Sequence, residues 1–324
     1  EIPKEAKDFF ELFPTLEQPL PAQQAILELA KILKTPGLVI IEEQMGAGKT
    51  EAAIALADCW NVELGQRGIY FALPTMATSN QMFGRVCEYL TIRFPDVDVP
   101  VYLLHGHASL VSDFKDIRDN KARATDIHDI SCDGVEGHSQ CPGNLVAADW
   151  FTYRKKGLLP PFGVGTVDQT LMAALRTSHA FVRLFGLAHK TIIIDEVHAY
   201  DTYMTKLIER LLEWLGALKS PVILLSATLP SDKRRALINA YARGLSGERE
   251  RNDELPESDY PRITWTTGDK PQAKTLLQKE EKKRELMVEW VDGRLEEQAD
   301  SCSLIGYLGQ ELRDKLENGG CAAV

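Results

Sequence analysis

A glycine-rich segment near the start of the chain has the residue types that bind phosphate. It follows a short apolar run, opens a stretch of helical character, and consists of Met45, Gly46, Ala47, Gly48, Lys49 and Thr50. Glycines let successive backbone N–H groups turn toward phosphate oxygens, and the start of a helix adds partial positive charge. In such a loop Lys49 reaches the β- and γ-phosphates, and the Thr50 hydroxyl binds Mg²⁺. The segment therefore predicts ATP and Mg²⁺ as cofactors.

Two carboxylates follow a second apolar run and support the phosphate-binding interpretation. Asp195 and Glu196 come directly after Thr191–Ile194. At the tip of a strand, Asp195 is the candidate to hold Mg²⁺ through its water shell, so that Thr50 and Asp195 form the metal site. Glu196 is the candidate to orient and deprotonate the water that attacks the γ-phosphate. The alternative for the two carboxylates is a solvated turn, and the alternative for the glycine-rich segment is a turn that only caps a helix. Glu43 also departs from the formal phosphate-loop pattern, which has Gly or Ala at this position.

A third apolar run ends in polar residues that could sense the nucleotide. Ser226, Ala227 and Thr228 follow Val222–Leu225. We expect the hydroxyls of Ser226 and Thr228 to reach the segment from Asp195 to His198, and His198 to pass on the state of the γ-phosphate. The alternative is that both hydroxyls cap a helix beginning near Ser231.

The elements that must position these residues alternate along the chain. The expected strands are Leu38–Ile41, Gly68–Leu73, Val99–Leu104, Gly163–Val167, Thr191–Ile194 and Val222–Leu225. The helical patterns are Glu51–Leu64, Ser79–Ile92, Leu171–Thr177 and Tyr203–Leu218. Strands that are apolar on both faces and separated by helices indicate an α/β fold with a doubly wound parallel sheet. Ligands of such sheets bind beyond the carboxyl ends of the strands.

The three motifs, in this order, resemble motifs I, II and III of superfamily-two helicases. Pro19–Gln24 resembles the Q motif, whose glutamine reads adenine, and both Gln23 and Gln24 remain candidates for that glutamine. Phe71–Thr75, followed by Asn80 and Arg85, resembles motif Ia, which grips the nucleic-acid backbone. This resemblance implies a RecA-like P-loop fold.

Flanking residues narrow the resemblance to the helicase portion of CRISPR-associated type I helicase-nucleases. They lie at 45–53, 161–169 and 195–201, and the similarity runs from about Pro19 to Pro230. The family implies an ATP-driven single-stranded-DNA translocase that is recruited to an R-loop by a CRISPR surveillance complex, in antiviral defence in a prokaryotic cytoplasm. The candidate nucleic-acid contacts are Thr75, Asn80, Arg85, Thr166, Asp168 and Gln169. For both threonines, capping of a helix or turn is the alternative.

The resemblance also divides the chain. We expect a leader at 1–18, the first RecA-like ATP-binding lobe at 19–269, a charged connector at 270–300 and the truncated start of a second RecA-like lobe at 301–324. Within these, 243–259 reads as a solvated excursion and 270–296 as helix-prone. The family's metal-dependent nuclease domain has no expected counterpart here, and His128–Asp129 is attributed to chance.

Composition limits the partners. A net charge of −10 opposes contact with nucleic acid except at local sites, and no apolar run is long enough to span a membrane. The six scattered cysteines indicate reduced thiols in a cytosol, and we expect a monomer. A zinc site would use His128, Cys132, His138 and Cys141, although an exposed insertion is favoured.

Three other functions remain open at this stage. A related RNA helicase would share the ATP site. A truncated lobe could act as an ATP-gated binding module, because the family's arginine fingers come from the second lobe. A P-loop kinase is disfavoured because it needs no Ser-Ala-Thr motif.

Overall fold

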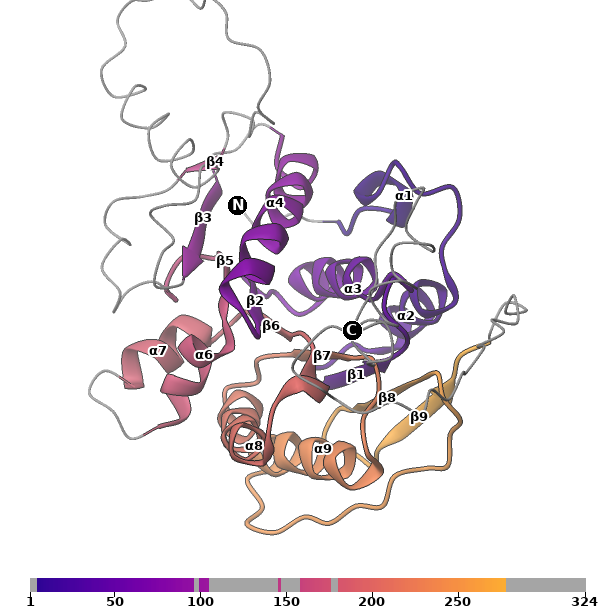
Figure 1. Ribbon diagram of the computed structural model, residues 1–324, viewed down its shortest axis with the longest axis vertical. Helices are drawn as coiled ribbons and strands as arrows, with labels where there is room; N and C mark the ends of the chain where they lie inside the picture. Colours follow the sequence, from indigo (N-terminus) through magenta and orange to yellow (C-terminus); the bar gives the residue numbers. More distant parts are fainter. Residues whose placement is uncertain (1–4, 96–98, 105–144, 147–157, 176–179, 278–324) are drawn as a thin grey trace, which may run out of the picture. The chain divides into compact units, whose positions relative to one another are not determined.

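The computed structural model describes residues 5–95, 99–104, 145–146, 158–175 and 180–277, and Figure 1 shows their arrangement. The strands form one sheet in the order β4-β3-β5-β2-β6-β7-β1-β8-β9. Their bounds are β1 Leu38–Glu42, β2 Ile69–Leu73, β3 Val99–Leu104, β4 Leu145–Val146, β5 Phe162–Thr166, β6 Thr191–Ile194, β7 Val222–Ser226, β8 Arg262–Thr266 and β9 Gln272–Thr275. The pairs from β4 to β1 are parallel, and β8 and β9 are antiparallel.

Helices cover both faces of the sheet, as a doubly wound topology requires. Figure 1 shows α2, α3 and α4 on one side of the strands and α6, α8 and α9 on the other. The helices are α1 Phe9–Leu12, α2 Pro21–Ile32, α3 Lys49–Glu63, α4 Met76–Arg93, α6 Val167–Ala174, α7 Ala180–Leu187, α8 Thr202–Ala217 and α9 Ser231–Ser246, with a 3₁₀ turn η3 at Val197–Ala199. Every residue of β1, β2, β5, β6 and β7 is buried, which explains their continuous apolar runs. The mostly parallel α/β sheet confirms the expected fold class.

The six expected strands are all present, with small differences at their ends. The fourth expected strand ends at Thr166, and Val167 is already the first residue of α6, four residues before the expected helix at Leu171. Helix α9 continues to Ser246, so the excursion begins later than the expected residue 243. No helix in the described ranges is long and apolar enough to cross a membrane.

The hairpin of β8 and β9 was not expected from the sequence. It pairs antiparallel with β1, and Gln272–Thr275 is a strand although the range 270–296 reads as helix-prone. The physical reason is its position at the edge of the sheet, where largely exposed polar residues replace the apolar pattern of an interior strand. The sheet therefore extends past residue 269 into the expected connector.

The residues before Pro19 are built into the same unit. Asp58 of α3 is buried, and its carboxylate accepts hydrogen bonds from the Tyr89 hydroxyl at 2.7 Å, from Arg93 Nε at 2.7 Å and from the Lys7 backbone N–H at 3.2 Å. Lys7 in turn donates from Nζ to the Ile92 carbonyl oxygen at 2.7 Å. The described part of the expected leader thus packs on α3 and α4.

Several sequence-based interpretations lie outside the described residues. They are the zinc candidates His128, Cys132, His138 and Cys141, the dipeptide His128–Asp129, and the ranges 279–300 and 301–324. Within the described ranges, no group of three or more His, Cys, Asp or Glu side chains is placed to hold a metal ion.

Candidate functional site

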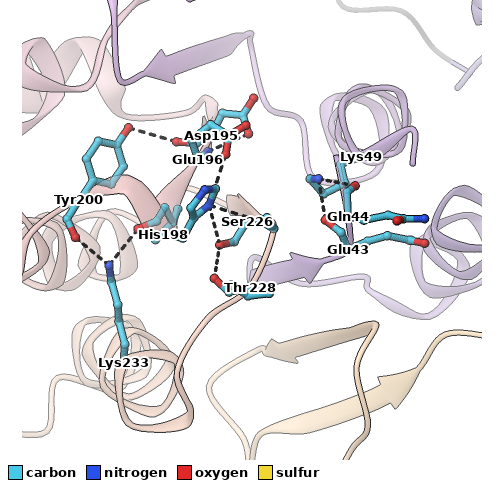
Figure 2. Close-up of polar contacts among 12 residues, drawn as sticks. Glu43, Gln44, Lys49, Asp195, Glu196, His198, Tyr200, Ser226, Thr228 and Lys233 are labelled. Atoms are coloured by element: carbon cyan, nitrogen blue, oxygen red, sulfur yellow. Dashed lines mark hydrogen bonds and ion pairs between the residues drawn. The ribbon is translucent and has the colours of Figure 1, made fainter. Parts of the chain in front are cut away.

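The expected chemical residues meet because β2, β6, β7 and β1 are neighbours in the sheet and point the same way. Their carboxyl ends carry, respectively, the start of α4, the Asp195–Glu196 turn, the Ser226–Pro230 loop and the phosphate loop. Figure 2 shows the last three converging. This edge of the sheet is where ligands of doubly wound folds bind.

The phosphate loop has the backbone that an anion requires. Gly46 and Gly48 adopt φ of +78° and +76°, a left-handed conformation that favours glycine. A Cβ on Gly48 would lie 2.2 Å from the Gln23 side-chain nitrogen, so any larger residue would displace the Gln23 side chain from the loop. Gly48 is the residue before α3, which begins at Lys49 and has Thr50 as its second residue. Ala47 and the exposed Met45 complete the loop.

Lys49 is folded back on its own loop. Its Nζ donates to the backbone carbonyl oxygens of Glu43 at 2.7 Å and Gln44 at 2.8 Å (Figure 2). Burial lowers the pKa of this ammonium, while Asp195, Glu196 and Glu43 act to raise it. The hydrogen bonds of this lysine are therefore local to its own loop, while the charges of Asp195 and Glu196 act on it from the neighbouring turn.

The two glutamines of the expected Q motif are separated by the structure. Gln23 is 1% exposed, accepts the Leu20 backbone N–H at 2.8 Å and donates to the Gly48 carbonyl oxygen at 3.2 Å. Gln24 is exposed on α2. Of the two, Gln23 is the one with a hydrogen bond to the phosphate loop, and the identity of the adenine-reading glutamine stays a prediction.

The turn after β6 holds its two carboxylates in different environments. Asp195 accepts the Glu196 backbone N–H at 2.8 Å, and its own backbone N–H donates to the Ala72 carbonyl oxygen at 2.9 Å. Burial raises the pKa of Asp195, against the opposing effects of Lys49 and Arg85. Glu196 has φ of 52° and ψ of 43°, which is unusual for a residue with a side chain.

His198 lies between Glu196 and the loop after β7. Its Nδ1 is 3.3 Å from a carboxylate oxygen of Glu196, 3.3 Å from the Ala227 backbone nitrogen and 3.4 Å from the Ser226 hydroxyl (Figure 2). A single ring nitrogen cannot accept the Ala227 N–H and donate to Glu196 at once. The geometry thus gives His198 two alternative hydrogen bonds.

Ser226 and Thr228 differ in their surroundings. The Ser226 hydroxyl is buried and donates to the Thr228 carbonyl oxygen at 2.8 Å. Thr228 is exposed, and it accepts this hydrogen bond through its backbone carbonyl rather than through its hydroxyl. The residue before α9 is Pro230, and no side chain caps this helix, so neither hydroxyl has the capping role that the sequence left open.

Two basic residues of α9 that the sequence did not single out approach the same turns. Lys233 donates to the carbonyl oxygens of Val197 at 2.9 Å and Tyr200 at 3.0 Å. Arg234 Nη1 lies 2.8 Å from a carboxylate oxygen of Glu42, a buried residue at the end of β1. In the sequence, both look like ordinary residues of a solvated helix, and only the topology brings them here.

Glu43 is a second residue whose importance the sequence did not show. It is 8% exposed, and its Oε2 has no hydrogen-bond partner among the described residues. Burial raises the pKa of this carboxyl group, and Lys49 opposes the shift. A buried carboxylate thus lies at the base of a loop suited to anions.

The expected nucleic-acid residues lie at neighbouring strand ends, since Leu73 of β2 pairs with Thr166 of β5. Thr75 caps α4 by accepting the Thr78 backbone N–H at 3.2 Å, as the alternative for this residue predicted. Thr166 is buried and makes no side-chain cap to α6.

The other four candidates have varied environments. Arg85 forms an ion pair with Glu51 of α3, and the Gln169 side-chain oxygen lies 3.4 Å from Arg183 Nη1. Asp168 is exposed and Asn80 is half-buried. The structure therefore places Thr75 and Thr166 next to neighbouring strand ends, whereas Asn80 and Arg85 lie further along α4.

Comparisons with known proteins identify relatives of the chain. No protein-family profile matches the chain. The chain is 38% identical over 270 residues to the CRISPR-associated endonuclease/helicase Cas3 of Thermus thermophilus, covering 83% of this chain and 27% of that protein. It is 36% identical over 291 residues to Cas3 of Streptococcus thermophilus, covering 87% and 30%. The chain thus spans less than a third of the length of these relatives.

Solved structures give the same result. The crystal structure of T. fusca Cas3 aligns with a TM-score of 0.79 at 36% identity, over 99% of this chain and 35% of that one. Its ATP complex aligns with a TM-score of 0.78 at 35% identity, over 99% and 34%. A CRISPR RNA-guided surveillance complex before nicking contains a chain that aligns with a TM-score of 0.56 at 33% identity, over 81% and 25%.

Proposed function

Because the chain is a Cas3 helicase-type protein, we propose that it provides the first RecA-like lobe of an ATP-driven translocase for single-stranded DNA. The observation that carries this proposal is that Lys49 follows β1 and Asp195 and Glu196 follow β6, on either side of β7, whose end is linked to His198 through Ser226. A phosphate loop alone would suit many nucleotide-binding proteins. The linked third strand end is what a motor needs to couple the nucleotide to movement.

The chain's residues have distinct roles in the proposed hydrolysis. Gly46, Gly48 and Lys49 bind the phosphates, and Gln23 is placed beside this loop to contact the base. Glu196 orients a water and takes its proton while the water oxygen bonds to the γ-phosphorus and the bond from that phosphorus to the ADP oxygen breaks. Burial of Asp195 and Lys49 in the same site keeps bulk water from screening their charges.

The donor set fits Mg²⁺. The half-buried Asp195 carboxylate has no ion pair among the described residues, and Thr50 adds a hydroxyl from the first turn of α3. Carboxylate and hydroxyl oxygens are the ligands that this hard ion prefers. When bound, Mg²⁺ would neutralise charge on the β- and γ-phosphates.

The proposed partners follow from the relatives. A similar chain lies in a CRISPR RNA-guided surveillance complex, which supports recruitment of this protein to the R-loop of such a complex, in antiviral defence in a prokaryotic cytoplasm. The candidate DNA contacts remain Thr75, Asn80, Arg85, Thr166, Asp168 and Gln169. The net charge of −10 favours a narrow contact with DNA made by hydroxyls, amides and a few cations. Separately, we propose that the protein acts as a monomer.

The test is the ATPase activity of the intact protein with Mg²⁺, alone and with single-stranded DNA or RNA of the same sequence. We expect DNA to stimulate turnover and RNA neither to stimulate it nor to compete. Equal stimulation by RNA would favour an RNA helicase. Tight ATP binding without turnover under every condition would favour an ATP-gated binding module.

A further inference from the structure

Lys233 connects the helix after the Ser226–Pro230 loop to the turn after β6. Its ammonium donates to the carbonyl oxygens of Val197 at 2.9 Å and Tyr200 at 3.0 Å (Figure 2). These two carbonyls lie at the start and just past the end of η3, the turn that contains His198. Burial lowers the pKa of this ammonium, so the side chain loses hydration in order to make these bonds.

The turn that Lys233 holds contains unfavourable backbone. Glu196, directly before η3, has φ of 52° and ψ of 43°. Such a conformation persists at a residue with a side chain only when surrounding contacts fix it. The Tyr200 hydroxyl supplies one contact by donating to the Asp195 carbonyl oxygen at 3.1 Å, and Lys233 supplies two more on the other side of the turn.

The first turn of α9 is itself firmly anchored. Arg234, the next residue, pairs with the buried Glu42 at the end of β1 at 2.8 Å. The other carboxylate oxygen of Glu42 accepts the Leu229 backbone N–H at 3.2 Å, just before α9 begins. Lys233 therefore extends from a base that is fixed both to the strand of the phosphate loop and to the loop after β7.

We propose that Lys233 is a positioning residue for hydrolysis, which sets the place of Glu196 and His198 by holding the carbonyls of Val197 and Tyr200. This inference rests on the proposed ATPase function. The Lys233 ammonium bonds to the turn after β6 and not to the phosphate loop, so we expect its loss to leave nucleotide binding intact (Figure 2). Loss of Lys233 moves the Glu196 carboxylate that must meet the attacking water. Small displacements of such a group have large effects on rate.

The test replaces Lys233 in the intact protein and measures DNA-stimulated ATPase together with binding of a fluorescent ATP analogue. We expect Lys233→Met to lower kcat at least about tenfold, with KM and analogue affinity within about twofold of the wild type. Lys233→Arg should restore most of the rate, because a guanidinium can donate to both carbonyls. Lys206→Met, at an exposed position of α8, removes an ammonium whose partner is Glu209 at 2.8 Å and should leave every value unchanged.

The possible outcomes separate the two proposals. An inactive wild type would overturn the proposed function, and this inference with it. An active wild type with an equally active Lys233→Met variant overturns the inference alone, as does a parallel fall in kcat and affinity that Lys233→Arg does not reverse. If Lys233→Met does not fold, Lys233→Gln, which keeps one donor, is judged by the same criteria.

Discussion

The phosphate loop and the turn after β6 face each other but are held in opposite ways. Lys49 bonds to carbonyls five and six residues away in its own loop. The turn after β6 bonds to elements distant in the sequence, since Lys233 and Ala227 donate to it from 28 or more residues beyond. Apart from Gln23 and the pairing of Glu43 with Ser226, the loop thus depends mainly on local contacts, whereas the turn depends on the tertiary structure.

This difference matches what the proposed function requires of each segment. A loop that admits phosphate gains from a cation whose present bonds can be exchanged for bonds to the ligand. A group that activates water gains from a fixed position, because catalysis depends on alignment. The comparison suggests that changes in the loop affect binding, whereas changes in the turn affect rate.

The largest expected effect tests the loop. Lys49→Ala removes the cation that would exchange its carbonyl partners for phosphate, so we expect binding of a fluorescent ATP analogue, and with it hydrolysis, to be abolished. Titration of the variant against the wild type measures this. Equal affinities would show that the loop is not the phosphate site.

The next effect tests the turn. Glu196→Gln keeps the shape of the side chain but cannot accept a proton, so hydrolysis should fall by about 10²–10⁴-fold while nucleotide affinity is retained. Steady-state ATPase and analogue binding are measured on the same preparation. Equal loss of both would make Glu196 a structural or metal-holding residue and remove the contrast between the segments.

A smaller effect concerns the link between the turn and the loop after β7. Ser226→Ala together with Thr228→Ala should lower strand separation by about tenfold and ATPase much less, because the Ser226 hydroxyl lies 3.4 Å from His198 Nδ1. The single variants sharpen this expectation: Ser226→Ala should account for most of the loss, since Thr228 contributes its backbone carbonyl. Parallel loss of both activities, or loss of neither, would remove the coupling role.

The smallest expected effect concerns Glu43 at the base of the phosphate loop and the stability of the folded protein. Burial raises the pKa of Glu43 above its ordinary value, so the folded protein binds more protons there than the unfolded chain. The free energy of unfolding therefore falls as pH rises from about 4.5 through the raised pKa, and Glu43→Gln should be more stable at pH 7 by about 1 kcal/mol. Urea unfolding at pH 4 and pH 7 checks this, with the exposed Glu63→Gln as control. A stability gain that is the same at both pH values would contradict the explanation.

The sequence predicted the interior of the sheet well because interior strands are apolar on both faces. It also predicted the phosphate loop and the Asp195–Glu196 turn, where glycine, lysine and acidic residues occur at strand ends. It could not predict β9, because Gln272–Thr275 is an exposed edge strand with no apolar alternation. Helix α1 was missed for another reason, since it is only four residues long and too short to show a helical period.

The unpredicted parts of the site share a different cause. Lys233 and Arg234 bond to residues more than 30 positions away in the sequence. Whether each side chain reaches its partner depends on how α9 packs. Glu43 looked like a minor departure from a pattern until its burial was known. Residue type and spacing indicate the chemistry of a single loop. Contacts made to that loop by a distant helix or strand can be identified only from the folded structure.

The β8–β9 hairpin determines how the strand of the phosphate loop can fluctuate. Without it β1 would be an edge, with one row of backbone groups open to solvent. With β8 on one side and β7 on the other, β1 is paired along both sides from Leu38 to Glu42. Its amide protons are thus protected by two neighbours and exchange with solvent only when a large part of the sheet opens, whereas those of β9 exchange by local fraying. The hairpin, although it contributes no residue to the proposed chemistry, places the phosphate loop at the end of a strand that is paired on both sides.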